Sequence, residues 1–170
     1  MKDTPLTNPA DILRYPWEDP PAFGEAIEVA KGVLWIRLPL PMKLDHVNVY
    51  ALDDGDSWTI VDTGFSSSKT KDIWRAVFAG PLAGKPVRRV VVTHYHPDHI
   101  GLAGWFQTEF DADLVTTRTS WLFARMLTLD VHSVPVPETM AFYRRAGMDP
   151  QIYDKRAAER PFNFGDVVDP

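Results

Sequence analysis

The 170-residue sequence contains no cysteine, which excludes disulfide bonds and thiolate ligands for a metal. It contains no run of about 18 apolar residues, so it offers no candidate for a membrane-spanning helix. Residues 1–5 lack the apolar run of a secretory signal peptide. These absences predict a cytoplasmic protein, and they leave any metal site to nitrogen and oxygen donors.

Basic residues are also scarce, since 18 Lys and Arg stand against 23 Asp and Glu and the formal charge is −5. Phosphate neutralisation requires clustered basic side chains, but Arg88–Arg89 and Arg144–Arg145 are only pairs. The charge therefore argues against nucleic acid as a partner and favours a small-molecule substrate. The length suits about one domain with a core of its own.

The chain divides into three parts by composition. Residues 1–24 are rich in proline and predict an irregular arm. Residues 25–116 alternate between β-prone and helical patterns and predict the folded core. Residues 117–170 are helical in character, with proline breaks, and we expect them to form a helical segment.

The core begins with short β-branched and aromatic segments separated by turn residues, a pattern typical of an antiparallel meander. After Gly64 the apolar spacing becomes helical, and the segments then alternate between strand and helix. This order predicts an α/β sheet covered by helices. The expected strands are residues 26–29, 33–38, 48–52, 58–61, 87–93 and 113–116, and the expected helices are residues 66–80 and about 98–108.

The most informative segment is His94-Tyr95-His96-Pro97-Asp98-His99, which holds three of the five histidines. Imidazole nitrogen and carboxylate oxygen are ligands for zinc and similar divalent metals. If the chain stays extended, His94 and His96 point the same way and can chelate one ion. Asp98 and His99 fall in the first turn of the next helix, after Pro97, and approach from another direction. This geometry favours two metal positions over one.

Asp62, in the turn Val61-Asp62-Thr63-Gly64, is the second candidate residue. It follows a buried strand, where it is either a turn residue that accepts backbone N–H bonds or a carboxylate that orients a ligand histidine. His46 and His132 lie in loops, and we expect packing or solvent roles for them rather than metal binding.

These residues resemble the metallo-β-lactamase-fold metal-dependent hydrolases. The resemblance rests on the metal motif after a buried strand and on the Val-Asp-Thr-Gly turn about thirty residues before it, and it covers residues 26–116. It implies an αββα sandwich in which His94 and His96 bind one zinc, and Asp98 and His99 bind a second. It further implies a metal-bridging hydroxide as the nucleophile. On this resemblance Asp98 and Asp62 are the candidate catalytic carboxylates, and the cofactor is two zinc ions per complete domain, with iron or manganese as alternatives.

The family completes its site with further histidine and aspartate ligands well downstream, and no such motif occurs before Pro170. We therefore expect the chain to be the N-terminal half of such a domain, with the helical segment at its end. Half a sandwich would leave one sheet face uncovered. It would also leave both ions under-coordinated, so we expect weak metal binding and little activity from the isolated chain. The expected protein partner is a second copy or a complementary C-terminal half.

Within the family, the favoured reaction is hydrolysis of an ester, thioester or lactone bond. Three alternatives remain open. The first is a phosphodiesterase or nuclease of the same fold. The second is a dioxygenase that holds one iron and acts on persulfide-type sulfur. The third is a non-catalytic fragment that acts by association.

Overall fold

The computed structural model describes residues 16–169 of the chain. Most of the predicted proline-rich arm, residues 1–15, therefore lies outside the described residues. Residues 16–26 contain bends and a turn but no helix or strand before the first strand begins.

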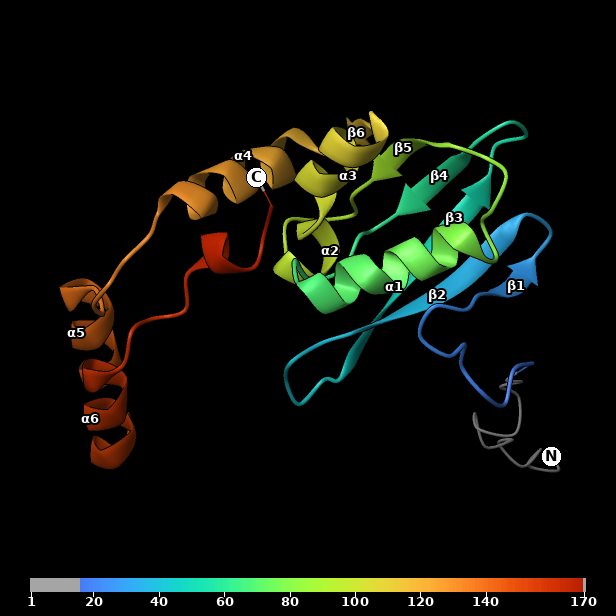
Figure 1. Ribbon diagram of the computed structural model, residues 1–170. Coiled ribbons are helices and arrows are strands. Elements are labelled where there is room, and N and C mark those ends of the chain that lie inside the picture. The colour runs from blue at the N-terminus through green and yellow to red at the C-terminus, as the bar shows by residue number, and fades with distance from the viewer. Residues whose placement is uncertain (1–15, 170) are drawn as a thin grey trace, which may run out of the picture.

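One sheet of six strands runs in sequence order across the molecule (Figure 1). The first, second, third and fourth strands pair antiparallel with one another in order. The fourth then pairs parallel with the fifth, and the fifth pairs parallel with the sixth. The predicted meander and the predicted α/β sheet with alternating strands and helices are both confirmed. The strands are β1 (Ile27–Ala30), β2 (Val33–Pro39), β3 (His46–Asp53), β4 (Trp58–Val61), β5 (Val87–Val91) and β6 (Asp113–Val115).

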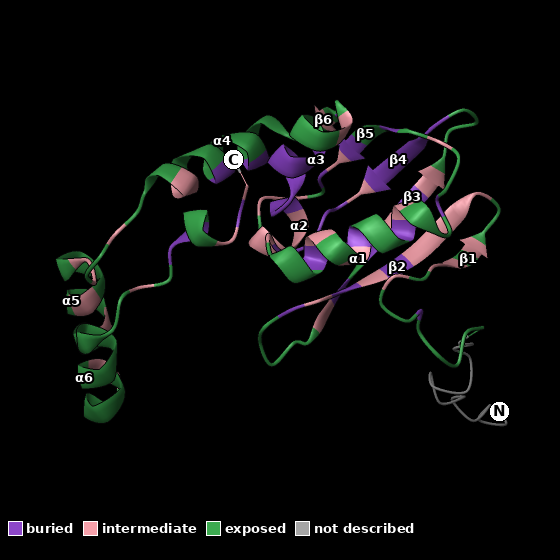
Figure 2. Ribbon diagram, in the orientation of Figure 1, coloured by how far each residue is buried: buried purple, intermediate pink, exposed green. Residues whose placement is uncertain are grey.

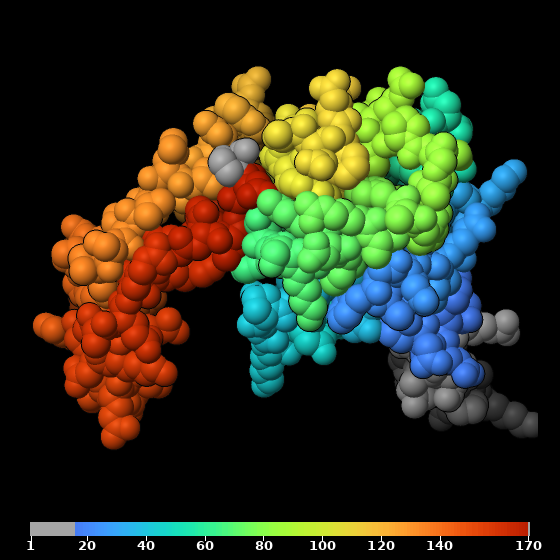
Figure 3. All heavy atoms as spheres, in the orientation of Figure 1, coloured from blue at the N-terminus to red at the C-terminus, as the bar shows by residue number. Residues whose placement is uncertain are grey.

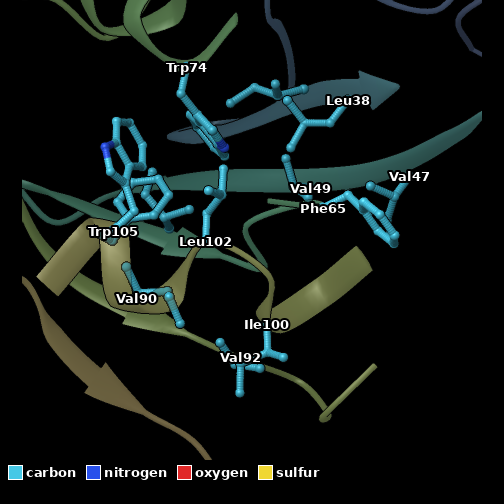
Figure 4. Packing of buried hydrophobic residues seen from close by; sticks show 14 of the residues in the cluster. Leu38, Val47, Val49, Phe65, Trp74, Val90, Val92, Ile100, Leu102 and Trp105 are labelled. Carbon is cyan, nitrogen blue, oxygen red and sulfur yellow. The ribbon is translucent and has the colours of Figure 1, made fainter. Parts of the chain in front are cut away.

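Three helices lie across one face of this sheet: α1 (Ser68–Ala79), α2 (Pro97–Ile100) and α3 (Ala103–Phe110) (Figure 1). The core forms between these helices and the strands, where Ile36, Val49 and Val90 are fully buried. Trp74 of α1 enters this layer with its ring edge to face on Phe106, 5.1 Å between centroids. Figure 4 shows the same packing, with Trp74 and Leu102 pointing toward the strands. Parallel strands with crossover helices place their helices against the sheet in this manner.

The single helix expected over residues 98–108 is instead two helices, α2 and α3, and this prediction is wrong in detail. The break falls at Gly101 and Leu102, because the backbone N–H of Leu102 donates to the hydroxyl of Thr63 at 3.0 Å. The backbone N–H of Leu102, just before α3, therefore bonds to a distant residue rather than within a helix. Sequence spacing alone does not predict such a tertiary contact.

The opposite face of the sheet carries Trp35, Tyr50 and Val61 at intermediate exposure. No helix of residues 16–169 lies across this face in Figure 1. The indole N–H of Trp35 donates to the side chain of Asn48, 2.8 Å away, so part of the face is polar. The described chain therefore consists of one helical layer on one sheet, with the second face open.

The last part of the chain contains α4 (Arg118–Leu129), α5 (Pro137–Arg145), α6 (Pro150–Ala158) and the short 3-10 helix η2 (Phe164–Asp166). The described residues 117–169 are thus largely helical. Neither α5 nor α6 contains a buried residue, and Figures 2 and 3 show the two as a lobe that projects from the body. In the described part of the chain, no helix is both long and apolar enough to cross a membrane.

Asn163 closes the base of this lobe. Its side-chain oxygen accepts from the backbone N–H of His132 at 2.7 Å, and its amide nitrogen donates to the carbonyl of His132 at 2.9 Å. The side chain is almost fully buried, so these hydrogen bonds are shielded from water. The chain therefore leaves the body at residue 132 and returns at residue 163 through one fixed point.

Candidate metal centre

The two sequence segments singled out above follow neighbouring parallel strands. Val61 at the end of β4 pairs with Val91 at the end of β5, so Asp62 and the metal motif start from the same edge of the sheet. The backbone N–H of Asp62 donates to the carbonyl of Val91 at 2.9 Å. The carboxyl edge of parallel strands is where open α/β sheets place their active sites.

Asp62 is the polar centre of this edge. Its side chain accepts from the backbone N–H of Thr93 at 2.8 Å and from the Thr93 hydroxyl at 2.8 Å. Nδ1 of His99 lies 2.8 Å from Oδ2 of the same carboxylate. The backbone of Asp62 is left-handed, with φ of 62°, a conformation that aspartate tolerates better than most residues. Both sequence-based interpretations describe its contacts, because Asp62 accepts a backbone N–H bond from Thr93 and also lies within hydrogen-bond distance of His99.

The pKa values of Asp62 and His99 move apart. Burial of the Asp62 carboxyl opposes its ionisation, but hydrogen bonds from His99 and Thr93 together outweigh burial and lower its pKa. Burial also opposes the charge of His99, but the hydrogen bond to Asp62 and the charges of Asp62 and Asp98 raise its pKa. For His94, burial and the neighbouring imidazoles of His99 and His96 lower the pKa.

These contacts fix which nitrogen of two histidines carries the proton. An ionised Asp62 can only accept, so Nδ1 of His99 donates to it and Nε2 is left with a free lone pair. The Thr93 hydroxyl has one proton, which it donates to Asp62, so it accepts from Nδ1 of His94 at 3.0 Å. Nε2 of His94 is then also free to bind a metal. One buried carboxylate thus sets the tautomers of His94 and His99, one of them through Thr93.

The three imidazoles of the motif gather together. The ring centroid of His94 lies 4.5 Å from that of His96 and 4.0 Å from that of His99. Residues 93–95 form a bend rather than a continued strand, so the rings converge through the turn and not by strand alternation as expected.

Asp98 completes the donor set. Its Oδ2 lies 3.4 Å from Nε2 of His99. Two ligands about 2.0–2.1 Å from one zinc at the tetrahedral angle are about 3.4 Å apart, so this pair fits one ion. Yet no group of three or more such side chains within residues 16–169 is already spaced to hold an ion. Nitrogen and oxygen donors of this kind suit a divalent metal such as zinc, and the four side chains would supply part of its coordination sphere.

Thr63 joins the two segments, and sequence reasoning did not single it out. Its backbone N–H and its hydroxyl both donate to the carbonyl of His99, each at 2.8 Å. Its carbonyl accepts from the buried indole of Trp74 at 2.8 Å. Thr63 thus fixes the Asp62 turn to the metal motif from inside the core. In the sequence, the only feature that pointed to this role was a hydroxyl side chain directly after Asp62.

Tyr95 borders the motif, whereas His132 and His46 lie apart from it. Tyr95 stacks on Phe123 of α4, 5.2 Å between centroids and 23° between planes, which brings the helical segment to the side of the motif.

His132 lies at the base of the α5–α6 lobe with Nε2 2.8 Å from Asp130, and His46 contacts Asp45. These contacts, with Asp130 and Asp45, lie outside the motif. A cavity of about 430 Å³ beside His132 lies between α4, α5, α6 and residues 160–164.

Known proteins are similar to this chain in fold and, in part, in sequence. The superposition on a beta-lactamase domain protein from Burkholderia ambifaria gives a TM-score of 0.72 at 37% identity, over 89% of this chain and 43% of that one. A metallo-beta-lactamase family protein from Thermus thermophilus gives 0.61 at 21% identity over 84% and 44%, a likeness of fold alone. A curated relative, "Probable metallo-hydrolase YqjP" of Bacillus subtilis (strain 168), is 36% identical over 85 residues.

The chain spans less than half the length of these proteins: 43% and 44% of the two solved structures and 25% of the Bacillus subtilis relative. The family model described as "Metallo-beta-lactamase superfamily" matches residues 42–169, which include Asp62 and the whole metal motif. That match covers well over half of the chain, and the mixed α/β fold agrees with it. The chain therefore belongs to the metallo-beta-lactamase superfamily.

Proposed function

We propose that this chain carries the first metal ligands of a hydrolase for ester, thioester or lactone bonds, with two zinc ions in the complete domain. His94 and His96 would hold one ion, and Asp98 and His99 the other. The single observation that carries the proposal is the Asp62–His99–Asp98 arrangement. Nδ1 of His99 faces a buried carboxylate at 2.8 Å, and Nε2 faces a second carboxylate at 3.4 Å. A histidine held in this way is typical of a metal ligand.

A divalent ion bound here would lower the pKa of a water molecule toward neutral and polarise the carbonyl under attack. The protein's own part is to prepare the ligands. Asp62 keeps the proton of His99 on Nδ1, and Thr93 does the same for His94. Because Asp62 is buried and its contacts lie within the protein, the rings of His99 and, through Thr93, His94 would be held before any ion arrives.

Charge favours a small-molecule substrate over nucleic acid. The basic pair on β5 is matched by acidic residues of the turn before β4: Arg88 lies 3.7 Å from Asp56, and Arg89 lies 3.8 Å from Asp54. These residues belong to the opposite end of β5 from the motif. With a formal charge of −5 and this pairing, the described surface offers little to attract phosphates toward the metal centre.

Zinc titration of the chain by calorimetry, followed by assays on a thioester, a lactone and a phosphodiester, tests the proposal. We expect weak zinc binding that the Asp98→Asn variant reduces further, while Asp130→Asn, a matched change at the lobe, leaves it unaltered. A chain that binds no zinc would contradict the proposal. Two tight sites would contradict the expectation that each ion is under-coordinated.

Metal analysis and the substrate panel separate the alternatives. One equivalent of iron with no bound zinc would favour the oxygenase, and preferential cleavage of the phosphodiester would favour the nuclease. The chain spans less than half the length of its structural relatives. Little hydrolysis by this chain, with clear hydrolysis by a longer polypeptide that includes it, would therefore agree with the proposal. A stable monomer in solution would count against a second copy as partner.

A further inference from the structure

The segment that returns from the α5–α6 lobe, residues 163–169, ends against the metal centre. The backbone N–H of Ser66 donates to the carbonyl of Val167 at 2.9 Å. The backbone N–H of Asp169 donates to the carbonyl of Gly101 at 2.7 Å. Ser66 follows the Asp62 turn, and Gly101 follows the metal motif. The return segment therefore touches both parts of the chain that form the centre.

A charged contact strengthens this junction. Oδ2 of Asp169 lies 2.7 Å from Nζ of Lys71 in the first turns of α1, and only 33% and 26% of the two side chains are exposed. Val168, between the two backbone hydrogen bonds, is 5% exposed. It borders a cavity of about 270 Å³ whose walls include Ile100. The segment is thus anchored by a partly shielded ion pair and a buried apolar side chain.

The geometry of the centre depends on how the Asp62 turn sits against the motif. Thr63 sets this relation from the core side through two hydrogen bonds to the carbonyl of His99. The return segment bridges the same two pieces from the other side. We infer that Asp169 is a positioning residue of the metal centre, which acts through Lys71 and Gly101 to hold Asp62 in place against His99.

This inference rests on the proposed function and adds a residue to it. The helical segment, residues 117–170, then has a role at the centre: its last residues complete the support of the ligands. Changing groups that hydrogen-bond directly to metal ligands costs about 10- to 100-fold in affinity. The side chain of Asp169 contacts Lys71 and no residue of the motif, and its backbone hydrogen bond to Gly101 persists in the variant, so we expect Asp169→Ala to weaken metal affinity by less than about 10-fold.

Cobalt(II) titration followed by the visible absorption of the bound ion is the test. Asp169→Ala and Lys71→Met should each weaken binding and alter the cobalt spectrum. The charge-reversed pair Lys71→Asp with Asp169→Lys should restore both. Asp166→Ala is the matched control, because it breaks the ion pair of Asp166 with Arg160 in the same segment without touching Ser66 or Gly101. Equal affinity and spectrum in Asp169→Ala and the unmodified chain would overturn the inference.

A second measurement needs no metal. In the metal-free chain, Nδ1 of His99 donates its proton to Oδ2 of Asp62, 2.8 Å away. The exchange of this proton with water can be followed by NMR. Faster exchange in Asp169→Ala, with no change in Asp166→Ala, supports the positioning role. Unchanged exchange refutes it. If the unmodified chain binds neither cobalt nor zinc, the proposed function fails, and this exchange rate alone decides the role of Asp169.

Discussion

Gly101 is the position at which the smallest chemical change should do the most damage to the centre. A Cβ added there would lie 2.4 Å from the carbonyl oxygens of Gly64 and Pro97 and 2.8 Å from the backbone nitrogen of Ser66. Ordinary contacts begin near 3.4 Å, so the methyl group overlaps three backbone atoms by roughly half an ångström to one ångström. Backbone cannot move aside as a flexible side chain can, so Gly101→Ala must push the Asp62 turn away from the motif.

The size of the effect follows from two opposing contributions. Gly101 has helical dihedrals, φ −53° and ψ −35°, so alanine is allowed there and would stabilise by about 0.4–1 kcal/mol through the unfolded chain. Overpacking costs about 1–3 kcal/mol in an ordinary core and more where backbone is the obstacle. We expect a net loss of about 2 kcal/mol in the free energy of unfolding, or about 4–8 °C in Tm for a chain of this length.

Urea unfolding and zinc affinity measured together test this prediction. Gly101→Ala should lower both the midpoint and the affinity. Gly55→Ala is the control: nothing lies within 4 Å of its added Cβ, and its φ of +86° alone costs about 1–2 kcal/mol. The control should lose stability without losing affinity. A Gly101→Ala chain as stable as the unmodified one, with unchanged affinity, would refute the packing argument.

Three further outcomes concern the carboxylate and its partners. Asp62→Asn keeps a side chain that tolerates the left-handed backbone but removes the charge, so zinc affinity should fall about 10- to 100-fold in a chelator competition. Thr93→Val should weaken zinc binding and mix the tautomers of His94 in NMR spectra, whereas Thr93→Ser should not; similar behaviour of the two would exclude the hydroxyl. The raised pKa of His99 gives stability that is complete below its unfolded value of 6.5 and lost as pH rises through the folded value. The lowered pKa of Asp62 gives stability that is present above 3.8 and lost as pH falls through its folded value. Urea midpoints of the metal-free chain at constant ionic strength should therefore show a contribution from the pair that is largest between about pH 4 and 6.5, and Asp62→Asn should abolish it.

The sequence was most predictive where one local rule decided the structure. The β-branched and aromatic segments separated by turn residues predicted the meander, and the change to helical spacing after Gly64 predicted α1. The run Val90-Val91-Val92 is typical of a strand buried on both faces, and β5 is present, but Val91 is only partly buried because the second face of the sheet is open. The four motif residues are also neighbours in space, because they lie within six consecutive residues of the chain.

The relations between distant segments could not be predicted from pattern. The division of one helix into α2 and α3 depends on the hydroxyl of Thr63, 39 residues before Leu102. The return segment donates to Gly101 from 68 residues away, as the contact of Asp169 shows. Hydrogen bonds of this kind leave no periodic signal, because each is satisfied by a single residue whose neighbours in sequence are unconstrained.

The α5–α6 lobe, which Asn163 closes at its base, can vary in length and sequence more than the rest of the fold can. The ends of the excursion, residues 132 and 163, are held side by side by one side chain, and neither α5 nor α6 adds a residue to the core. Lengthening or shortening a loop between fixed ends changes its closure free energy only slowly, by about 0.6 kcal/mol per doubling. Evolution can therefore exchange, extend or shrink the thirty or so residues between these points while the sheet and the metal ligands keep their places. Relatives that share the strands and the motif can then differ most in this excursion.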